Sequence, residues 1–133
     1  MKLMQTYIDC MIQHAVQDTP NECCGIIAGK DGEATGLYQM TNSAASPYRY
    51  SMDPKELYTT YREIEDQGSD ILAIYHSHTH TEAYPSQTDV RLASWPEAIY
   101  ILISLAQESP LVRAFWIQDG VITEEEIQIS DSA

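Results

Sequence analysis

Apolar residues recur at helical spacing at the start of the chain and again near its centre. Apolar positions three and four residues apart predict an amphipathic helix over residues 2–17, which the segment "DTPN" ends. A second helix is predicted over residues 53–68. Asp53 suits its N-cap, Pro54 its first helical position and Gly68 its C-terminal end.

Apolar runs bounded by turn residues predict the strands. The predicted strands cover residues 23–30, 34–42, 48–52, 71–78, 98–106, 111–118 and 121–130, and a short third helix covers residues 86–95. The charged stretch "TEEEIQI", in which isoleucines alternate with polar residues, is typical of a solvated edge strand. Helices interspersed with strands predict an α/β fold: one domain over residues 1–133, with a mixed sheet and flanking helices.

Composition narrows the function classes. The chain has 133 residues, enough for one domain with a sizeable core. Seven Lys and Arg residues against 20 Asp and Glu give a net charge of -13, which disfavours nucleic acid as a partner. Three cysteines, two of them adjacent, fit a reducing compartment better than a disulfide framework. No apolar run approaches the ~18 residues of a membrane span, and the N-terminal segment is too polar for a signal peptide, so we expect a cytoplasmic protein with no membrane partner.

The segment "YHSHTHTEAYPSQTD" holds three of the four histidines at alternate positions. On a strand, residues i and i+2 face the same side and lie ~6.5 Å apart, so His76 and His78 can direct two imidazoles at one point. Asp89, at the start of the predicted short helix, can add a carboxylate oxygen. This ligand set suits Zn²⁺ with the fourth position left for water, so the pattern predicts a candidate metal site.

Taken singly, these residues have other interpretations. His76 and His78 can be sheet histidines that are bonded to backbone carbonyls. The run "SQTD" matches a capping signature, with Ser86 as N-cap and Asp89 as an acid of the first turn. His80 continues the alternating series and, on spacing alone, can be a ligand. The combination of residues, rather than any one of them, therefore carries the prediction.

The combination resembles a known motif. The spacing H-x-H-x(7)-S-x(2)-D, with a glutamate upstream in "PNECCGIIAG", is similar to that of the JAMM (MPN-plus) zinc metalloproteases, and the predicted elements follow that family's order. The run "TEAYPS" resembles the bacterial Mec-type branch, whose members trim the C-termini of ubiquitin-like sulfur-carrier proteins. The resemblance implies a JAB1/MPN-like fold with a cytidine-deaminase-like architecture.

The resemblance also implies roles for individual residues. His76, His78 and Asp89 would bind Zn²⁺, Glu22 would accept a proton from water, and Ser86 would donate a hydrogen bond to the developing oxyanion. A hydroxyl has one donor and two acceptor sites, so Ser86 can also cap the helix. The implied reaction is hydrolysis of the (iso)peptide bond after the C-terminal Gly-Gly of a ubiquitin-like sulfur-carrier protein, which releases cysteine or a short tail.

Two other function classes stay open at this point. A noncatalytic MPN-type scaffold is one, although such relatives generally lack the metal-binding residues present here. Another zinc hydrolase is the second; the C-x-x-C pair and H-x-E signature of zinc deaminases are absent, and the acidic surface disfavours the DNA-linked RadC-like relatives. Cys23 and Cys24 are expected to be two small buried hydrophobic residues, with a thiolate near the metal as the alternative.

Overall fold

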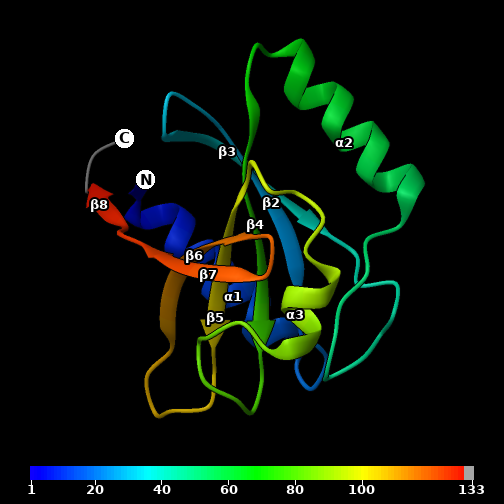
Figure 1. Ribbon diagram of the computed structural model, residues 1–133, viewed down its shortest axis with the longest axis vertical. Coiled ribbons are helices and arrows are strands. Elements are labelled where there is room, and N and C mark those ends of the chain that lie inside the picture. Colours follow the sequence, from blue (N-terminus) through cyan, green and yellow to red (C-terminus); the bar gives the residue numbers. More distant parts are fainter. Residues whose placement is uncertain (131–133) are drawn as a thin grey trace.

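The computed structural model describes residues 1–130, in which helices are interspersed among the strands (Figure 1). In chain order the elements are β1 (Lys2–Met4), α1 (Gln5–Asp18), β2 (Cys24–Lys30), β3 (Glu33–Met40), α2 (Pro54–Asp66), β4 (Asp70–His78), α3 (Gln87–Leu92), β5 (Ile99–Ser104), β6 (Leu111–Gln118), β7 (Val121–Glu125) and β8 (Gln128–Ser130). The predicted α/β class with a mixed sheet is confirmed. Within these residues no helix is both long and apolar enough to span a membrane.

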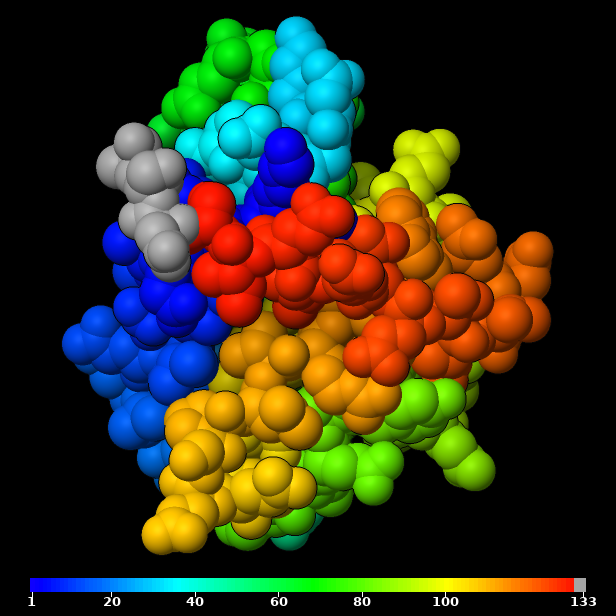
Figure 2. All heavy atoms as spheres, turned by 90° about the vertical axis from the view of Figure 1, so that its left-hand side faces the viewer, coloured from blue at the N-terminus to red at the C-terminus, as the bar shows by residue number. Residues whose placement is uncertain are grey.

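The strands of residues 1–130 form one sheet in the order β7-β6-β5-β4-β2-β3-β1-β8. At its centre β4 pairs with β5 in parallel and with β2 in antiparallel orientation. β7 and β8 lie at opposite edges, yet only residues 126–127 separate them in the chain, so the sheet must curl until its edges approach. Figure 2 shows the red segment near the C-terminal end of the described residues lying beside the dark blue N-terminal residues.

Strand alternation divides the sheet into a core face and a site face. On β4, Ala73 and Tyr75 join the buried cluster that packs against α1. Ile74, between them, joins a different cluster with residues of α3 and of the segment before α2. Successive side chains of a strand point to opposite faces, so the even-numbered His76 and His78 lie on the face away from α1. The fold thus places α1 and the main core on one face of the sheet and the two histidines on the other face.

The second predicted helix agrees well with the structure. The Asp53 carboxylate accepts a hydrogen bond from the backbone N–H of Glu56 at 3.0 Å, so Asp53 is the N-cap of α2. Gly68 follows the helix with a φ of +77°, a conformation that favours glycine. Helix α2 therefore forms where its capping residues indicate.

The structure corrects four of the predicted boundaries. Residues 2–4 form β1 instead of helix, because they pair in parallel with β8. The predicted strand over residues 48–52 is wrong: the structure has there only an isolated bridge between Asn42 and Met52. The third helix covers only Gln87–Leu92 of the predicted 86–95. The predicted strand 121–130 is interrupted, and its parts β7 and β8 occupy opposite sheet edges, where most of their residues are at least partly exposed.

Gly25 is required where β2 passes over a buried tyrosine. A Cβ atom at this position would meet the ring of Tyr75, which is fully buried. The ring has no room to move, because the Tyr75 hydroxyl lies 2.7 Å from Nδ1 of the buried His14 and forms a hydrogen bond with it. A side chain at residue 25 would therefore disturb the packing between β2 and β4, the strands that lead to the site.

We expect Gly25→Ala to lower the free energy of unfolding by about 1–3 kcal/mol or more, because overpacking a filled core forces strain. Urea unfolding measures the change. Gly36→Ala in β3 is the matched control, since its Cβ would meet the nearest atom, on Tyr38, at an ordinary 3.5 Å. Equal stability of the two variants would contradict this account of Gly25.

Candidate metal centre

Two histidines and one aspartate converge at the C-terminal end of β4. Nε2 of His76 lies 3.1 Å from Oδ1 of Asp89, and Nε2 of His78 lies 2.9 Å from Oδ2. All three residues are buried, and one potential ligand atom from each lies within 4.8 Å of the others. The structure therefore brings together the three predicted ligands in a group that could hold a metal ion.

The carboxylate of Asp89 is fixed by the start of α3. The Ser86 hydroxyl accepts a hydrogen bond from the Asp89 N–H at 3.0 Å, and the Ser86 N–H donates to Oδ2 of Asp89 at 2.9 Å. This reciprocal pair is a capping box, so the capping interpretation of "SQTD" is confirmed. The same bonds hold Asp89 in place opposite the histidines.

A hydrogen bond between Nδ1 and a backbone carbonyl fixes the tautomer of His78. Its Nδ1 lies 2.8 Å from the backbone carbonyl oxygen of Glu82. A carbonyl oxygen only accepts, so in this bond Nδ1 carries the proton, and Nε2 of the neutral ring keeps the lone pair that can bind a metal ion. This is the outer contact that orients a ligating imidazole.

Three buried polar atoms near this point have no hydrogen-bond partner among residues 1–130. They are both ring nitrogens of His76 and Oε1 of Glu22. Nε2 of His76 is close to Asp89, but the two groups are not aligned for a hydrogen bond. Buried polar atoms without partners are costly in free energy. A cation between His76, His78 and Asp89 would bind one of the two ring nitrogens of His76 and so give it a partner. The side chains therefore fit a metal ion.

The protonation states also suit a cation. Burial acts to raise the pKa of Asp89, but its interactions with the His76 and His78 rings outweigh burial and hold that pKa well below its usual range. Burial lowers the pKa of His76. Burial also acts to lower the pKa of His78, but its bonds to Asp89 and to the Glu82 carbonyl raise it overall. An ionised carboxylate beside imidazoles is a donor set typical of zinc sites.

Glu22 lies beside the centre, in the connection between α1 and β2, and is buried. Burial raises its pKa to about 8; the charge of His78 opposes this shift and that of Asp89 adds to it. Cys24 of β2 pairs with His76 of the antiparallel β4, so Glu22, two residues before Cys24, lies beside the end of β4 that carries His78. A carboxyl group with a pKa near neutrality is suited to proton transfer.

The remaining candidates lie outside the cluster. His80 is exposed, and its Nδ1 bonds with the Thr79 hydroxyl at 2.8 Å. Cys23 and Cys24 are fully buried, as predicted, in different clusters on the two faces of the sheet. Burial raises the pKa of each thiol to about 12, so both are neutral thiols at neutral pH.

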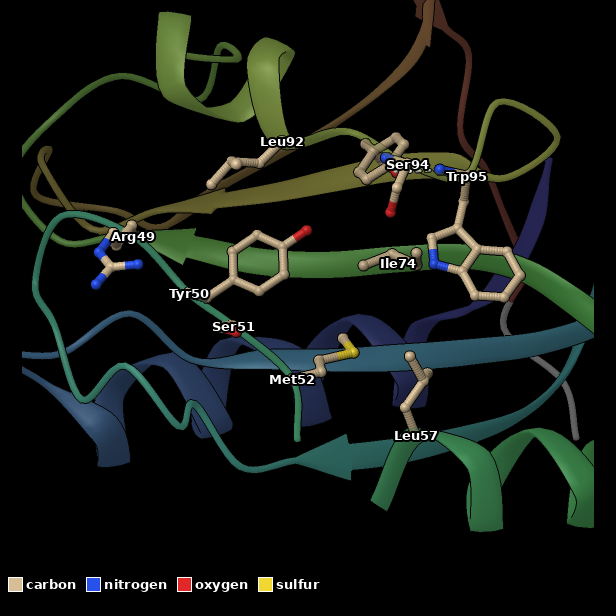
Figure 3. A pocket seen from close by; sticks show the side chains of 10 residues that line it. Arg49, Tyr50, Ser51, Met52, Leu57, Ile74, Leu92, Ser94 and Trp95 are labelled. Atoms are coloured by element: carbon tan, nitrogen blue, oxygen red, sulfur yellow. Dashed lines mark hydrogen bonds between the residues drawn. The ribbon is translucent and has the colours of Figure 1, made fainter. Parts of the chain in front are cut away.

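Two hollows adjoin the centre. A cavity of about 310 Å³ extends from Tyr50, whose ring stacks on His76 at 4.6 Å between centroids. Figure 3 shows Tyr50 facing this cavity, with Trp95 towards one end and Arg49 towards the other. A more polar groove of about 480 Å³ is lined by Glu22 and Asn42, among others.

Sequence reasoning missed Tyr50 and Asn42. Asn42 is the last residue of the predicted strand over residues 34–42, and Tyr50 lies in the predicted strand over residues 48–52. The only local signal is the polar "TNSAASP" before the aromatic "YRY", which departs from strand alternation.

Comparison with known proteins decides the family. The model for prokaryotic homologs of the JAB domain matches residues 4–118. The chain belongs to this prokaryotic JAB family. A CysO-cysteine peptidase from Mycobacterium tuberculosis is 41% identical over 125 residues, which cover 92% of this chain and 86% of that protein. A desampylase from Haloferax volcanii is 38% identical over 104 residues, which cover 72% of this chain and 74% of that protein.

Solved structures agree with this JAB assignment. The solution structure of a Desulfitobacterium hafniense protein has a TM-score of 0.90 at 36% identity, covering 98% of this chain and 93% of that one. A JAB1/MPN domain protein from Archaeoglobus fulgidus has a TM-score of 0.65 at 15% identity, covering 98% and 100%. The latter supports the fold alone. The JAMM/MPN-plus resemblance and the JAB1/MPN-like fold inferred from the sequence are confirmed.

We expect the folded protein to bind one divalent metal ion per chain through the convergent group. His76→Ala, His78→Ala and Asp89→Ala should each reduce metal content to a small fraction, because each removes one of three protein ligands. His80→Ala is the matched control and should leave metal content unchanged. Elemental analysis after dialysis measures the metal, and full occupancy in the His78→Ala protein would contradict the assignment.

Proposed function

We propose that this chain is a zinc-dependent JAMM-type peptidase. In this proposal it hydrolyses the (iso)peptide bond after the C-terminal Gly-Gly of a ubiquitin-like sulfur-carrier protein and releases cysteine or a short tail. The observation that carries the proposal is the convergence of His76, His78 and Asp89 beside the buried, unpartnered carboxylate of Glu22. The substrate class is supported by the 41% identity to a CysO-cysteine peptidase and by the similarity to a desampylase.

Zinc is the metal that this ligand set favours. Two imidazoles and one carboxylate, with a position left for water, match the open ligand sets of catalytic zinc sites. In this proposal His76, His78 and Asp89 hold the ion. A bound zinc ion would polarise the scissile carbonyl and lower the pKa of water towards ~7.

Glu22 is the proposed general base and general acid. Its carboxylate takes a proton from the attacking water and delivers it to the nitrogen of the leaving amine. The environment suits both steps, because burial raises the proton affinity of Glu22 and leaves Oε1 without a partner among the described residues. Proton transfer of this kind contributes roughly 10²–10⁴-fold to the rate.

Ser86 is the proposed oxyanion donor. Its hydroxyl oxygen already accepts the Asp89 N–H, so the hydroxyl proton is free to point elsewhere. Ser86 is exposed, unlike the three proposed ligands, and can therefore meet a substrate. A hydrogen bond to the carbonyl oxygen as it becomes negative would stabilise the transition state.

The form of the centre favours a thin, flexible substrate segment. The proposed ligands are buried, so the scissile bond must approach them closely. Glycine has no side chain and permits such an approach, as the residues before the cleaved bond would in a Gly-Gly tail. We expect the carrier's folded domain to supply most of the affinity, and the catalytic unit to be a single domain, residues 1–133, that acts in the cytoplasm.

A noncatalytic scaffold explains the site less well. A binding module has no need of a buried carboxylate without a partner, and Glu22 is such a group. The cysteine ligands of zinc deaminases are also missing, since both buried cysteines lie outside the convergent group.

Glu22→Gln separates the proton acceptor from the metal ligands. The substitution keeps the size of the side chain but removes its basicity, so we expect zinc content near wild type and hydrolysis reduced by at least ~10²-fold. Metal analysis and single-turnover assays of the same preparation measure both quantities. Loss of zinc from Glu22→Gln would mean that Glu22 is a ligand, and the proposed mechanism would be wrong.

The substrate class is tested with three compounds: a carrier–cysteine adduct, the same adduct with Gly-Gly replaced by Ala-Ala, and the free tail peptide. We expect rapid release of cysteine from the first only. The alanine methyl groups hinder close approach, and the free peptide lacks the folded domain. Intact mass measures cleavage. Equal cleavage of all three would indicate a general peptidase.

A further inference from the structure

The connection between β3 and α2 contains a segment with little regular structure that touches two parts of the site. We call residues 43–52 the strap. The Ser46 carbonyl accepts a hydrogen bond from the Glu22 N–H at 2.9 Å, and the Tyr50 ring stacks on His76. The strap therefore contacts both the proposed base and a proposed ligand.

The side chain of Asn42 organises the strap. A carboxamide has two N–H donors and two oxygen lone pairs. Nδ2 donates to the carbonyl oxygens of Glu22 and Arg49, each at 3.0 Å. Oδ1 accepts from the N–H of Ala44 at 3.0 Å and of Ser51 at 3.1 Å. All four positions are used, and one of them joins the strap to Glu22.

The main chain of Glu22 depends on these contacts. β2 begins only at Cys24, so Glu22 lies outside the sheet ladder. Its N–H bonds to Ser46 of the strap, and its C=O bonds to Asn42. The carboxylate itself is not held in place, because its Oε1 has no partner within residues 1–130. The position of the carboxylate is therefore set by the backbone behind it.

We propose that Asn42 is a positioning residue for Glu22: by tying the Glu22 carbonyl to the strap, its amide fixes the proposed base relative to the metal centre. The inference rests on the proposed function, in which Glu22 transfers the proton. A displacement of about 1 Å in a catalytic group can cost ~10²-fold in rate. Asn42 thus acts through Glu22 and need not touch substrate.

Asn42→Asp removes the Nδ2 donor and, with it, the bonds to the carbonyl oxygens of Glu22 and Arg49. The substitution keeps the shape and the acceptor for Ala44 and Ser51 but replaces the Nδ2 donor with an oxygen that faces two carbonyls. We expect kcat for the carrier–cysteine adduct to fall about 10- to 100-fold, with KM within about threefold and zinc content unchanged. Asn42→Ala, which removes all the bonds, should show at least the same loss.

Ser43→Ala is the matched control within the strap. The Ser43 hydroxyl donates to the Ser51 carbonyl at 2.9 Å, and it has no bond to Glu22. The variant loses one strap hydrogen bond, so kcat should stay within about threefold of wild type. Equal losses in Ser43→Ala and Asn42→Asp would mean that any loosening of the strap suffices, and would overturn the specific role of Asn42.

Two further readouts separate positioning from general stability. In a Glu22→Gln background, Asn42→Asp should lower the residual rate less than about threefold, because residues that act as a unit are not additive. The amide proton of Glu22 should exchange with solvent about tenfold faster in Asn42→Asp than in wild type. Its exchange rate should be unchanged in Ser43→Ala. The exchange experiment does not depend on catalysis.

The outcomes are distinguishable. Wild-type kcat in folded Asn42→Asp, or a full additional loss in the Glu22→Gln background, would overturn the inference. Unchanged exchange at Glu22 would do the same. A wild-type protein that cleaves no carrier would instead contradict the proposed function, while amide exchange would still test the bond between Asn42 and Glu22.

Discussion

The meeting of the Asp89 carboxylate with the rings of His76 and His78 is the interaction on which the site depends. It gathers polar groups in a buried place, which is unfavourable unless each finds a partner. β4 aims the rings, and the capping box of α3 holds the carboxylate. The same carboxylate is kept ionised by the groups that it would join in binding a metal. The fold therefore prepares a cation site.

Because side chains alternate along β4, one face of the strand packs into the core and the other carries the candidate metal ligands. Tyr75 faces α1 and fills the main core with its hydroxyl bonded to His14, while its neighbour His76 faces the site. The face of the sheet that packs against α1 holds the main hydrophobic core. The strap on the site face has little regular structure, and the side chain of Asn42 replaces the missing backbone ladder there. Precision at Glu22 therefore comes from side-chain hydrogen bonds.

The sequence predicts what short-range rules determine. The period of two on β4 put His76 and His78 on one face, and the capping signature at Ser86 put Asp89 at the start of α3. The combined motif and its resemblance to the JAMM family then grouped the three residues as ligands, and Asp53 and Gly68 marked α2. It does not predict β1, whose three residues are strand because they pair with β3 and with β8, which comes from the far end of the described chain. The stacking of Tyr50 on His76 likewise depends on the path of the strap, which Asn42 fixes through bonds up to 20 residues apart in sequence.

Anomalous diffraction on either side of the zinc absorption edge, from crystals grown with zinc, tests the central claim most directly. The account predicts a single zinc peak per chain, bound by His76, His78 and Asp89, with the Glu22 carboxylate next to it but not coordinated. A peak bound by His80 or Cys24, direct coordination by Glu22, or no zinc at the convergent group would contradict it.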